Sequence, residues 1–296
     1  MGVTMLNSKT IQKIYNSSVK DYTNPYATIH WSDAVNKQAE WFTSPRLISL
    51  YGTEEYANLE TSQQKQLSFW EAINFFSLNI HGEKALIEGL AQRLYQPDGV
   101  SRLDGIVNQY VHVFLAEENQ HMSYFGGFCT RYGNGPYPDR KFTFPKGESE
   151  PEEDDFLFFV KVLIFEEISD AYNRMMGVDP NLNPIARQIN QIHHHEETRH
   201  LIFGRQVVET LFEEYSSGWS ANTLARIRKY ISNYFASTWA EYYNPDVYRD
   251  AGFAEPFAIR QVAYTHPICQ AHRQHITENC VQFFLNTGIL EEKPTL

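Results

Sequence analysis

Residues 193–200 read HHHEETRH, and they stand inside a long run with the apolar spacing of a helix. The apolar residues of that run are Ile185, Ile189, Ile192, Leu201, Val207, Val208, Leu211 and Phe212. Because residues three, four and seven positions apart share one face of a helix, His193, Glu197 and His200 stack on one side. The same stripe continues through Gly204 toward apolar residues, so it is expected to face a core. Two imidazoles and a carboxylate on a core face need partners, since an unpaired buried charge is costly, and a metal ion would satisfy all three.

Three further long helices are expected before this one, at about residues 61–96, 101–131 and 152–176. Each has an apolar face and carries an acid or an imidazole near its middle, away from the ends where charged residues are normally solvated. These groups are Glu83 on the first helix, Glu118 and His121 on the second, and the adjacent Glu166 and Glu167 on the third. The fourth helix holds HHHEETRH, follows a break at residues 177–184 and is expected to end near Ser216.

The polar groups of these helices repeat one spacing. Glu118 and His121 form an E-x-x-H pair, and Glu197 and His200 form a second. One glutamate from each of two helices, with E-x-x-H from each of the other two, is the ligand set of ferritin-like dinuclear carboxylate sites. Carboxylates can bridge and neutralise two cations, imidazoles cap the outer positions, and open positions remain for oxygen. The sequence therefore predicts a dinuclear metal centre inside a helical bundle.

Three of the candidate ligands lie in pairs of adjacent glutamates, and only one of each of these pairs is expected to face the centre. Glu118 is favoured over Glu117 because it stands three residues before His121. The same spacing to its own histidine favours Glu197 over Glu196. The third pair, Glu166 and Glu167, has no histidine at this spacing, so the residues alone leave it open. The apolar pattern of its helix slightly favours Glu167.

Each of these features has another interpretation when it is taken by itself. A lone E-x-x-H is common on wet helix faces, Glu83 alone can be a buried salt-bridge partner, and three consecutive histidines can bind metal at a surface. The order of the groups on four successive helices is what favours the dinuclear centre.

The pattern resembles the p-aminobenzoate N-oxygenase family of non-haem di-iron enzymes. What sets that family apart is a third histidine one turn before the last E-x-x-H, and His193 stands there. The resemblance covers roughly residues 60–215, with further helices beyond, and it places the lone glutamate of the third helix at Glu166 rather than Glu167. The metal ligands that it implies are Glu83, Glu118, His121, Glu166, His193, Glu197 and His200.

The resemblance also implies a reaction. Two iron ions would use O₂, with electrons from an external donor, to oxygenate a small and aromatic amine toward a hydroxylamine or nitro product, as in secondary metabolism. Family members include enzymes that attack carbon or amines that are not aromatic, so a di-iron C–H hydroxylase stays open. A radical-generating subunit similar to the small subunit of ribonucleotide reductase is a further alternative, as the chain has 18 tyrosines. The third histidine counts against it, and against an iron-storage ferritin.

Polar residues outside the ligand set are candidates for orienting its imidazoles or binding substrate. Asp170, Glu196 and Arg199 lie near the expected ligands along the chain and can support them, although an exposed polar face explains them equally well. Arg260 and Arg273 can receive a substrate carboxylate, with surface pairing as the favoured role. His194 and His195 are expected to point away from the centre.

The remaining chain predicts more helices and no strands. Short helices are expected at residues 8–22 and 32–42, and longer ones at about 220–242, 255–264 and 267–287. Without an evident linker or repeat, residues 1–296 are expected to form one all-α domain, a ferritin-like helical bundle with a core at about 60–215 and additional N- and C-terminal helices.

Composition restricts the partners and the compartment. The net charge of −11, with no basic stripe, argues against nucleic acid. Three widely spaced cysteines without a CxxC pair predict no disulfide framework and favour the reducing cytoplasm. No run of apolar residues is long enough to span a membrane, and no signal peptide is evident at Met1. A homodimer is possible.

Overall fold

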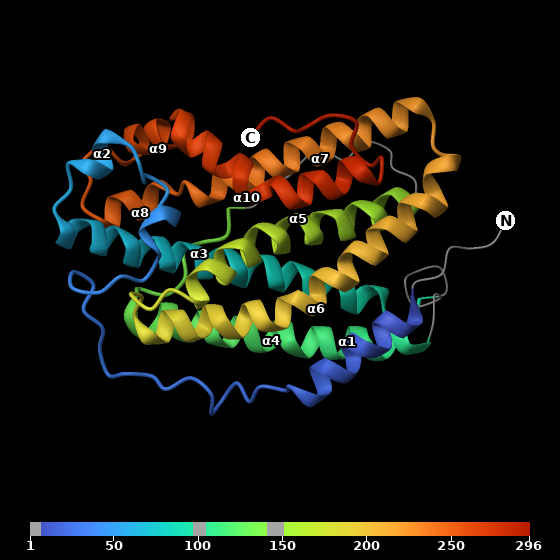
Figure 1. The fold of residues 1–296 in the computed structure, drawn as a ribbon, viewed down its shortest axis with the longest axis horizontal. Coiled ribbons are helices and arrows are strands. Elements are labelled where there is room, and N and C mark those ends of the chain that lie inside the picture. The colour runs from blue at the N-terminus through green and yellow to red at the C-terminus, as the bar shows by residue number, and fades with distance from the viewer. Residues whose placement is uncertain (1–6, 97–104, 141–150) are drawn as a thin grey trace.

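The computed structural model describes residues 7–96, 105–140 and 151–296. Four long helices form its centre: α3 (Thr61–Arg93), α4 (Gly105–Tyr132), α5 (Pro151–Gly177) and α6 (Pro184–Tyr215). They run along the long dimension of the molecule, where α5 packs along α6 and α3 packs along α4 (Figure 1). The four helices expected from the sequence are therefore confirmed. The turn residues Pro97, Asp98 and Gly99, which predict the end of the first of these helices, lie outside the described residues.

Shorter helices cover this centre on two sides. The N-terminal helix α1 (Ser8–Lys20) lies against α4 and α6. On the opposite side lie the helices that follow α6; three of them pack on α3 or α5, and the third in chain order packs on its two neighbours (Figure 1). They are α7 (Ala221–Tyr242), α8 (Pro245–Asp250), α9 (Pro256–Thr265) and α10 (Pro267–Asn286), and the short α2 (Glu54–Ala57) precedes α3. The additional N- and C-terminal helices are thus confirmed, although α8 was not expected.

Local signals in the sequence set the helix ends. Asn183 caps α6 by accepting hydrogen bonds from the backbone N–H groups of Ile185 and Ala186, and Pro184 fills the first helical position. At the start of α3, Glu60 and Gln63 form a capping box. Such caps satisfy backbone donors that have no partner within the helix.

Aromatic rings fill the space between α3 and α4. Phe76 stacks on Phe125 with ring centroids 5.0 Å apart, and Phe128 packs edge-on against Phe76 at the same separation. All three rings are fully buried. Burying each such side chain stabilises the fold by roughly 1.5–3 kcal/mol. These rings therefore hold α3 and α4 together next to the polar centre described below.

The prediction of a helix at residues 32–42 is wrong. This segment contains turns and a single β-bridge between Trp41 and Leu182. Asn36 accepts a hydrogen bond from the backbone N–H of Gln38, and its own N–H donates to the carboxylate of Glu40. Polar side chains that bind nearby backbone compete with helix formation, and here they hold the chain in an irregular path along the bundle.

Among the residues that the structure describes, no helix combines the length and the apolar character needed to cross a membrane. The three cysteines are free and buried, so no disulfide links the helices.

Candidate metal centre

Seven side chains from the four central helices converge at mid-bundle. The bundle brings together Glu83 from α3, Glu118 and His121 from α4, Glu166 from α5, and His193, Glu197 and His200 from α6. None of them is more than 2% exposed. Their potential ligand atoms lie within 4.8 Å of one another in three overlapping groups: Glu83 with His121 and His193, Glu118 with Glu197 and His200, and Glu166 with His193 and Glu197. These are the seven positions that the sequence and the resemblance indicate.

Glu197 lies at the middle of the cluster. Its Oε1 atom is 3.0 Å from Nδ1 of His200 and 3.1 Å from Nε2 of His193. Nδ1 of His121 lies 3.5 Å from the same oxygen. Each of the three imidazoles therefore turns one nitrogen toward the carboxylate of Glu197.

Several inward atoms of the cluster lack a hydrogen-bond partner. Both carboxylate oxygens of Glu83 and of Glu166 are buried without one, as are Nδ1 of His121 and Nε2 of His193. Unpaired polar atoms at such depth are costly unless a ligand satisfies them. Carboxylate oxygens and imidazole nitrogens facing one another across a few ångströms are the donor set that divalent transition metals bind. The residues present thus fit a pair of metal ions.

Burial also acts on the charges of the cluster. It raises the pKa of Glu83 to about 8 and the pKa of Glu166 well above the usual range of a carboxyl group. The neighbouring carboxylates, Glu118 among them, add to both shifts. This much negative charge in a small buried volume is stabilised either by protons or by cations, and cations would leave the carboxylates ionised.

The outward nitrogen of each imidazole is held by a different partner. Nε2 of His121 lies 2.7 Å from Oε2 of Glu196, and Nε2 of His200 lies 2.8 Å from Oε2 of Glu117. Nδ1 of His193 contacts the side-chain amide of Asn173. Partners of this kind fix the ring orientation and the tautomer of metal-binding histidines.

Only one of these partners, Glu196, was among the sequence candidates. Glu117 was set aside because the spacing favoured Glu118 as a ligand. Asn173 was missed, although it stands seven residues after Glu166 and so lies on the same face of α5. A buried amide on that stripe is the signal that could have found it.

Glu117 belongs to a buried ionic network that reaches α1. Arg199 donates to Glu117 Oε1 at 2.6 Å and to the hydroxyl of Ser18 at 2.7 Å, and Ser18 in turn donates to Glu117. Burial opposes ionisation of Glu117, but His200 and Arg199 outweigh it and lower its pKa to about 2. Arg199 therefore supports the centre through Glu117, and the N-terminal helix closes the network from outside.

The other candidate residues lie away from the cluster. Asp170 lies 2.6 Å from Nδ1 of His194, a histidine outside the cluster, so the structure does not favour the supporting role that was one of its two interpretations. Glu167 receives the side chain of Arg205 at 2.6 Å on the outer side of α5. His194 and the exposed His195 point away from the centre, as expected.

Arg260 and Arg273 serve the packing of the C-terminal helices. Arg260 donates to the backbone oxygen of Tyr243. Arg273 is buried, not at the surface as favoured from the sequence, and donates to the hydroxyl of Tyr243 and to the backbone oxygen of Tyr264. Neither arginine is placed to receive a substrate at the cluster.

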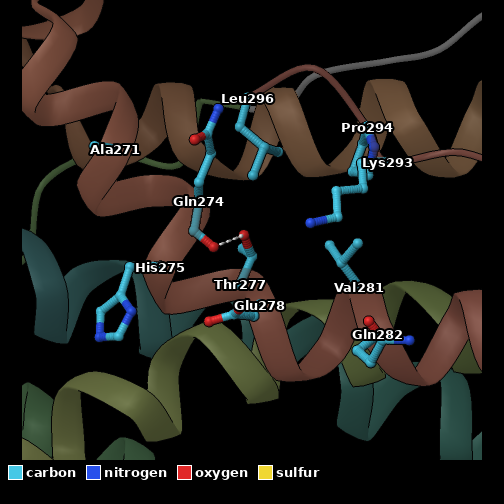
Figure 2. A pocket seen from close by; sticks show the side chains of 10 residues that line it. All are labelled: Ala271, Gln274, His275, Thr277, Glu278, Val281, Gln282, Lys293, Pro294 and Leu296. Carbon is cyan, nitrogen blue, oxygen red and sulfur yellow. Dashed lines mark hydrogen bonds between the residues drawn. The ribbon is translucent and has the colours of Figure 1, made fainter.

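Two cavities differ in their relation to the cluster. The larger, about 390 Å³, lies between α10 and the C-terminal tail and is lined by side chains such as His275, Glu278 and Lys293 (Figure 2). None of the seven clustered residues lines it. A pocket of about 230 Å³ between α3, α5 and α7 has Glu166 among its lining residues.

The comparisons with known proteins agree with this arrangement. A model of the family P-aminobenzoate N-oxygenase AurF matches residues 6–288. An R2-like ligand-binding oxidase without metal cofactor is 16% identical, with 95% of this chain and 96% of that chain covered and a TM-score of 0.50. A mutant R2-like ligand-binding oxidase with an anaerobically reconstituted Mn/Fe cofactor is 15% identical, with 95% and 93% covered and a TM-score of 0.50. A search of curated proteins finds no match.

At these identities the solved structures show the fold, which is ferritin-like, whereas the family match extends over nearly the whole chain. The resemblance inferred from the sequence is confirmed. The chain belongs to the P-aminobenzoate N-oxygenase AurF family and is an oxygen-dependent di-metal oxidase or oxygenase.

Proposed function

We propose that this protein is a non-haem di-iron oxygenase that uses O₂ to oxygenate the nitrogen of a small aromatic amine, giving a hydroxylamine and then a nitro product. The observation that carries the proposal is the third imidazole. His193 turns Nε2 into the cluster, 3.1 Å from Glu197 and 3.3 Å from Glu83, where it adds a neutral donor to four carboxylates and two histidines. Family membership supports the same chemistry.

We assign the metal ligands to the residues that the cluster brings together. They are Glu83, Glu118, His121, Glu166, His193, Glu197 and His200. Glu197 and His193 each belong to two of the three overlapping groups, so these two residues would hold the metal pair together with the other five. The bound iron pair supplies the activation of O₂ and the transfer of one oxygen atom. The other oxygen atom leaves as water, with electrons from an external donor and protons from solvent.

The protein's own residues prepare this chemistry by holding protons at defined atoms. With metal bound, the carboxylates of Glu117 and Glu196 would accept the outward N–H of His200 and His121 and leave the inward nitrogens to the ions. Nδ2 of Asn173 lies against Nδ1 of His193, and with the amide turned by 180° its oxygen would accept the outward N–H of this ring. The three imidazoles are then neutral donors.

Apolar rings keep water from the imidazoles. The ring of Phe114 stacks on His200 with centroids 3.9 Å apart, and Phe125 packs edge-on against His193 at 5.0 Å. Both phenylalanines are buried. A dry and rigid surround limits side reactions of an oxidising centre and strengthens its electrostatic interactions.

We further propose that residues 1–296 act as one domain with a core at about 60–215, because α1 packs on α4 and α6 and the C-terminal helices pack on α3 and α5. The free cysteines favour a reducing compartment, so we propose the cytoplasm.

The decisive experiment combines metal analysis with isotope labelling. Protein expressed with ample iron should hold about two irons per chain, as the seven-ligand set predicts. After reduction and exposure to ¹⁸O₂ with a panel of arylamines, mass spectrometry should find the label on nitrogen. Label on carbon alone would mean a C–H hydroxylase, and a stable tyrosyl radical without oxygenated product would mean a radical generator. One metal per chain would contradict the dinuclear centre itself.

A further inference from the structure

The pocket between α3, α5 and α7 is lined both by an exposed residue and by a residue of the cluster. Its volume is about 230 Å³, and its lining includes Gly82 and Ala85 from α3, Phe165 and Glu166 from α5, and Tyr230 and Tyr234 from α7. Ala85 is exposed and marks the mouth, whereas Glu166 is buried and marks the floor. Both carboxylate oxygens of Glu166 are without a hydrogen-bond partner at that depth. A polar group with open positions at the end of an apolar passage is where a reacting group would arrive.

Small residues on α3 shape the width of the pocket. A Cβ atom at Gly82 would collide with the ring of Phe165, so glycine at this position lets the ring pack directly on the helix. Gly89 makes the same room for the ring of Phe158, which also lines the pocket and lies under the guanidinium of Arg93, 4.0 Å from its centroid. The aromatic walls are therefore fixed by packing before any ligand binds.

The lining is largely aromatic, with the carboxylate of Glu166 at its buried end. Phe158 and Phe165 from α5 face the space, as do the rings of Tyr230 and Tyr234 from α7. Lys161 adds a positive charge to the lining. Flat rings favour aromatic walls of this kind, and the pocket meets the metal ligands at its Glu166 end.

We propose that this pocket is the substrate site and that it selects flat arylamines by width and not by length. The inference rests on the function proposed above. The amino group points toward Glu166, the ring lies among the four aromatic side chains, and the substituent opposite the amino group passes Ala85 into solvent. Because the mouth is open, long substituents at the para position are tolerated, whereas groups at both ortho positions are excluded by the walls.

The test measures binding first, since binding does not depend on turnover. Isothermal titration calorimetry would use the iron-loaded protein and 4-nitrobenzoate as a product-like probe. Ala85→Trp, at an exposed position, should close the mouth and weaken binding at least about tenfold. The matched control is Ala116→Trp, at an exposed alanine of α4 that does not line the pocket.

A second variant tests the wall. Gly82→Ala should displace the ring of Phe165 and weaken binding by a similar factor, whereas Gly126→Ala on α4 meets no neighbouring atom and should leave binding unchanged. Iron content and melting temperature, measured on every variant, separate a blocked pocket from a damaged centre. A substrate panel adds the selectivity: 4-aminohippurate should bind as well as 4-aminobenzoate, and 2,6-dimethylaniline should not bind.

The outcomes distinguish the pocket from the chemistry. Unchanged affinity in both pocket variants, or no binding of any arylamine to the wild-type protein, would overturn the substrate site. Rejection of 4-aminohippurate would equally overturn selection by width. If the pocket variants lose affinity but ¹⁸O₂ labels carbon alone, the substrate site stands and the N-oxygenation falls.

Discussion

Nε2 of His193 lies 3.1 Å from Oε1 of Glu197 one turn later on α6, and 3.3 Å from Oε1 of Glu83 on α3. The other nitrogen of the ring contacts Asn173 on α5. One imidazole thus makes polar contacts with three of the four central helices. Because imidazole is a neutral ligand, His193 would lower the proportion of negatively charged ligands around the metal ions.

The first prediction concerns His193 itself. His193→Ala should lower metal affinity at least about tenfold while the fold remains, because the other six ligands stay in place. Metal retained after dialysis against a graded chelator measures the affinity, and circular dichroism measures the fold. His194→Ala is the matched control, since this neighbour binds Asp170 and not the cluster. Equal retention in the two variants would remove His193 from the ligand set.

Glu166 and Glu167 give a sharper comparison, because they are adjacent in sequence and differ in environment. Glu166→Ala should lose most of the bound metal, since its oxygens are buried in the cluster. Glu167→Ala should keep it, since that carboxylate only pairs with Arg205. Inductively coupled plasma mass spectrometry on both proteins measures the metal per chain, and the reverse result would exchange their roles.

Asn173 is predicted to position His193 and not to bind metal itself. Asn173→Leu keeps the volume but removes the polar partner of Nδ1, so metal affinity should fall by roughly 10- to 100-fold. Asn190→Leu is the control, because Asn190 is equally buried and bonds only to the backbone oxygen of Ala186. If Asn173→His restores affinity, the role is positioning; equal losses at Asn173 and Asn190 would indicate a general packing defect.

A buried carboxyl group outside the centre predicts how stability depends on pH. Burial raises the pKa of Glu71 from 4.5 to about 7, against the opposing hydrogen bonds from Ser49. A group whose pKa is raised by folding contributes stability that is complete below its unfolded pKa and is lost as the pH rises through its folded pKa. For Glu71 this loss falls between about pH 4.5 and just above pH 7, and is on the order of 3 kcal/mol.

Glu71→Gln should therefore flatten the fall in melting temperature between about pH 5 and pH 8, because a neutral amide keeps an oxygen that can accept the bonds from Ser49. Differential scanning fluorimetry across that range measures the effect. Glu88→Gln, at an exposed position of α3, should follow the wild-type curve. A parallel curve for Glu71→Gln would show that this carboxyl group is not the source of the pH dependence.

The sequence by itself determined which helices carry the centre and most of the residues that meet there. Helical spacing places Glu118 with His121, and Glu197 with His200, on shared faces whatever the rest of the fold does, because the geometry lies within one helix. Mid-helix carboxylates such as Glu83 stand out for the same reason, since a charge on an apolar face requires a partner.

Spacing within one helix could not choose between Glu166 and Glu167. Helix α5 is apolar around much of its circumference, so its pattern does not say which side faces the centre. The tertiary structure decides it, because α5 packs on its neighbours with Glu166 toward the cluster and Glu167 toward Arg205. The resemblance gave the same position, but from a known spacing and not from the residues.

The supporting partners and the segment at residues 32–42 depended on the tertiary structure in the same way. Whether Glu117 meets His200, or Asn173 meets His193, depends on how far one helix is shifted along another, and no pattern within a single helix contains that offset. The local pattern at 32–42 permits a helix, but Asn183 donates its backbone N–H to the oxygen of Trp41 and fixes this strand-like end of the segment beside α6. Contacts between segments far apart in the chain decided both, because their energies exceed the small preferences of a single turn.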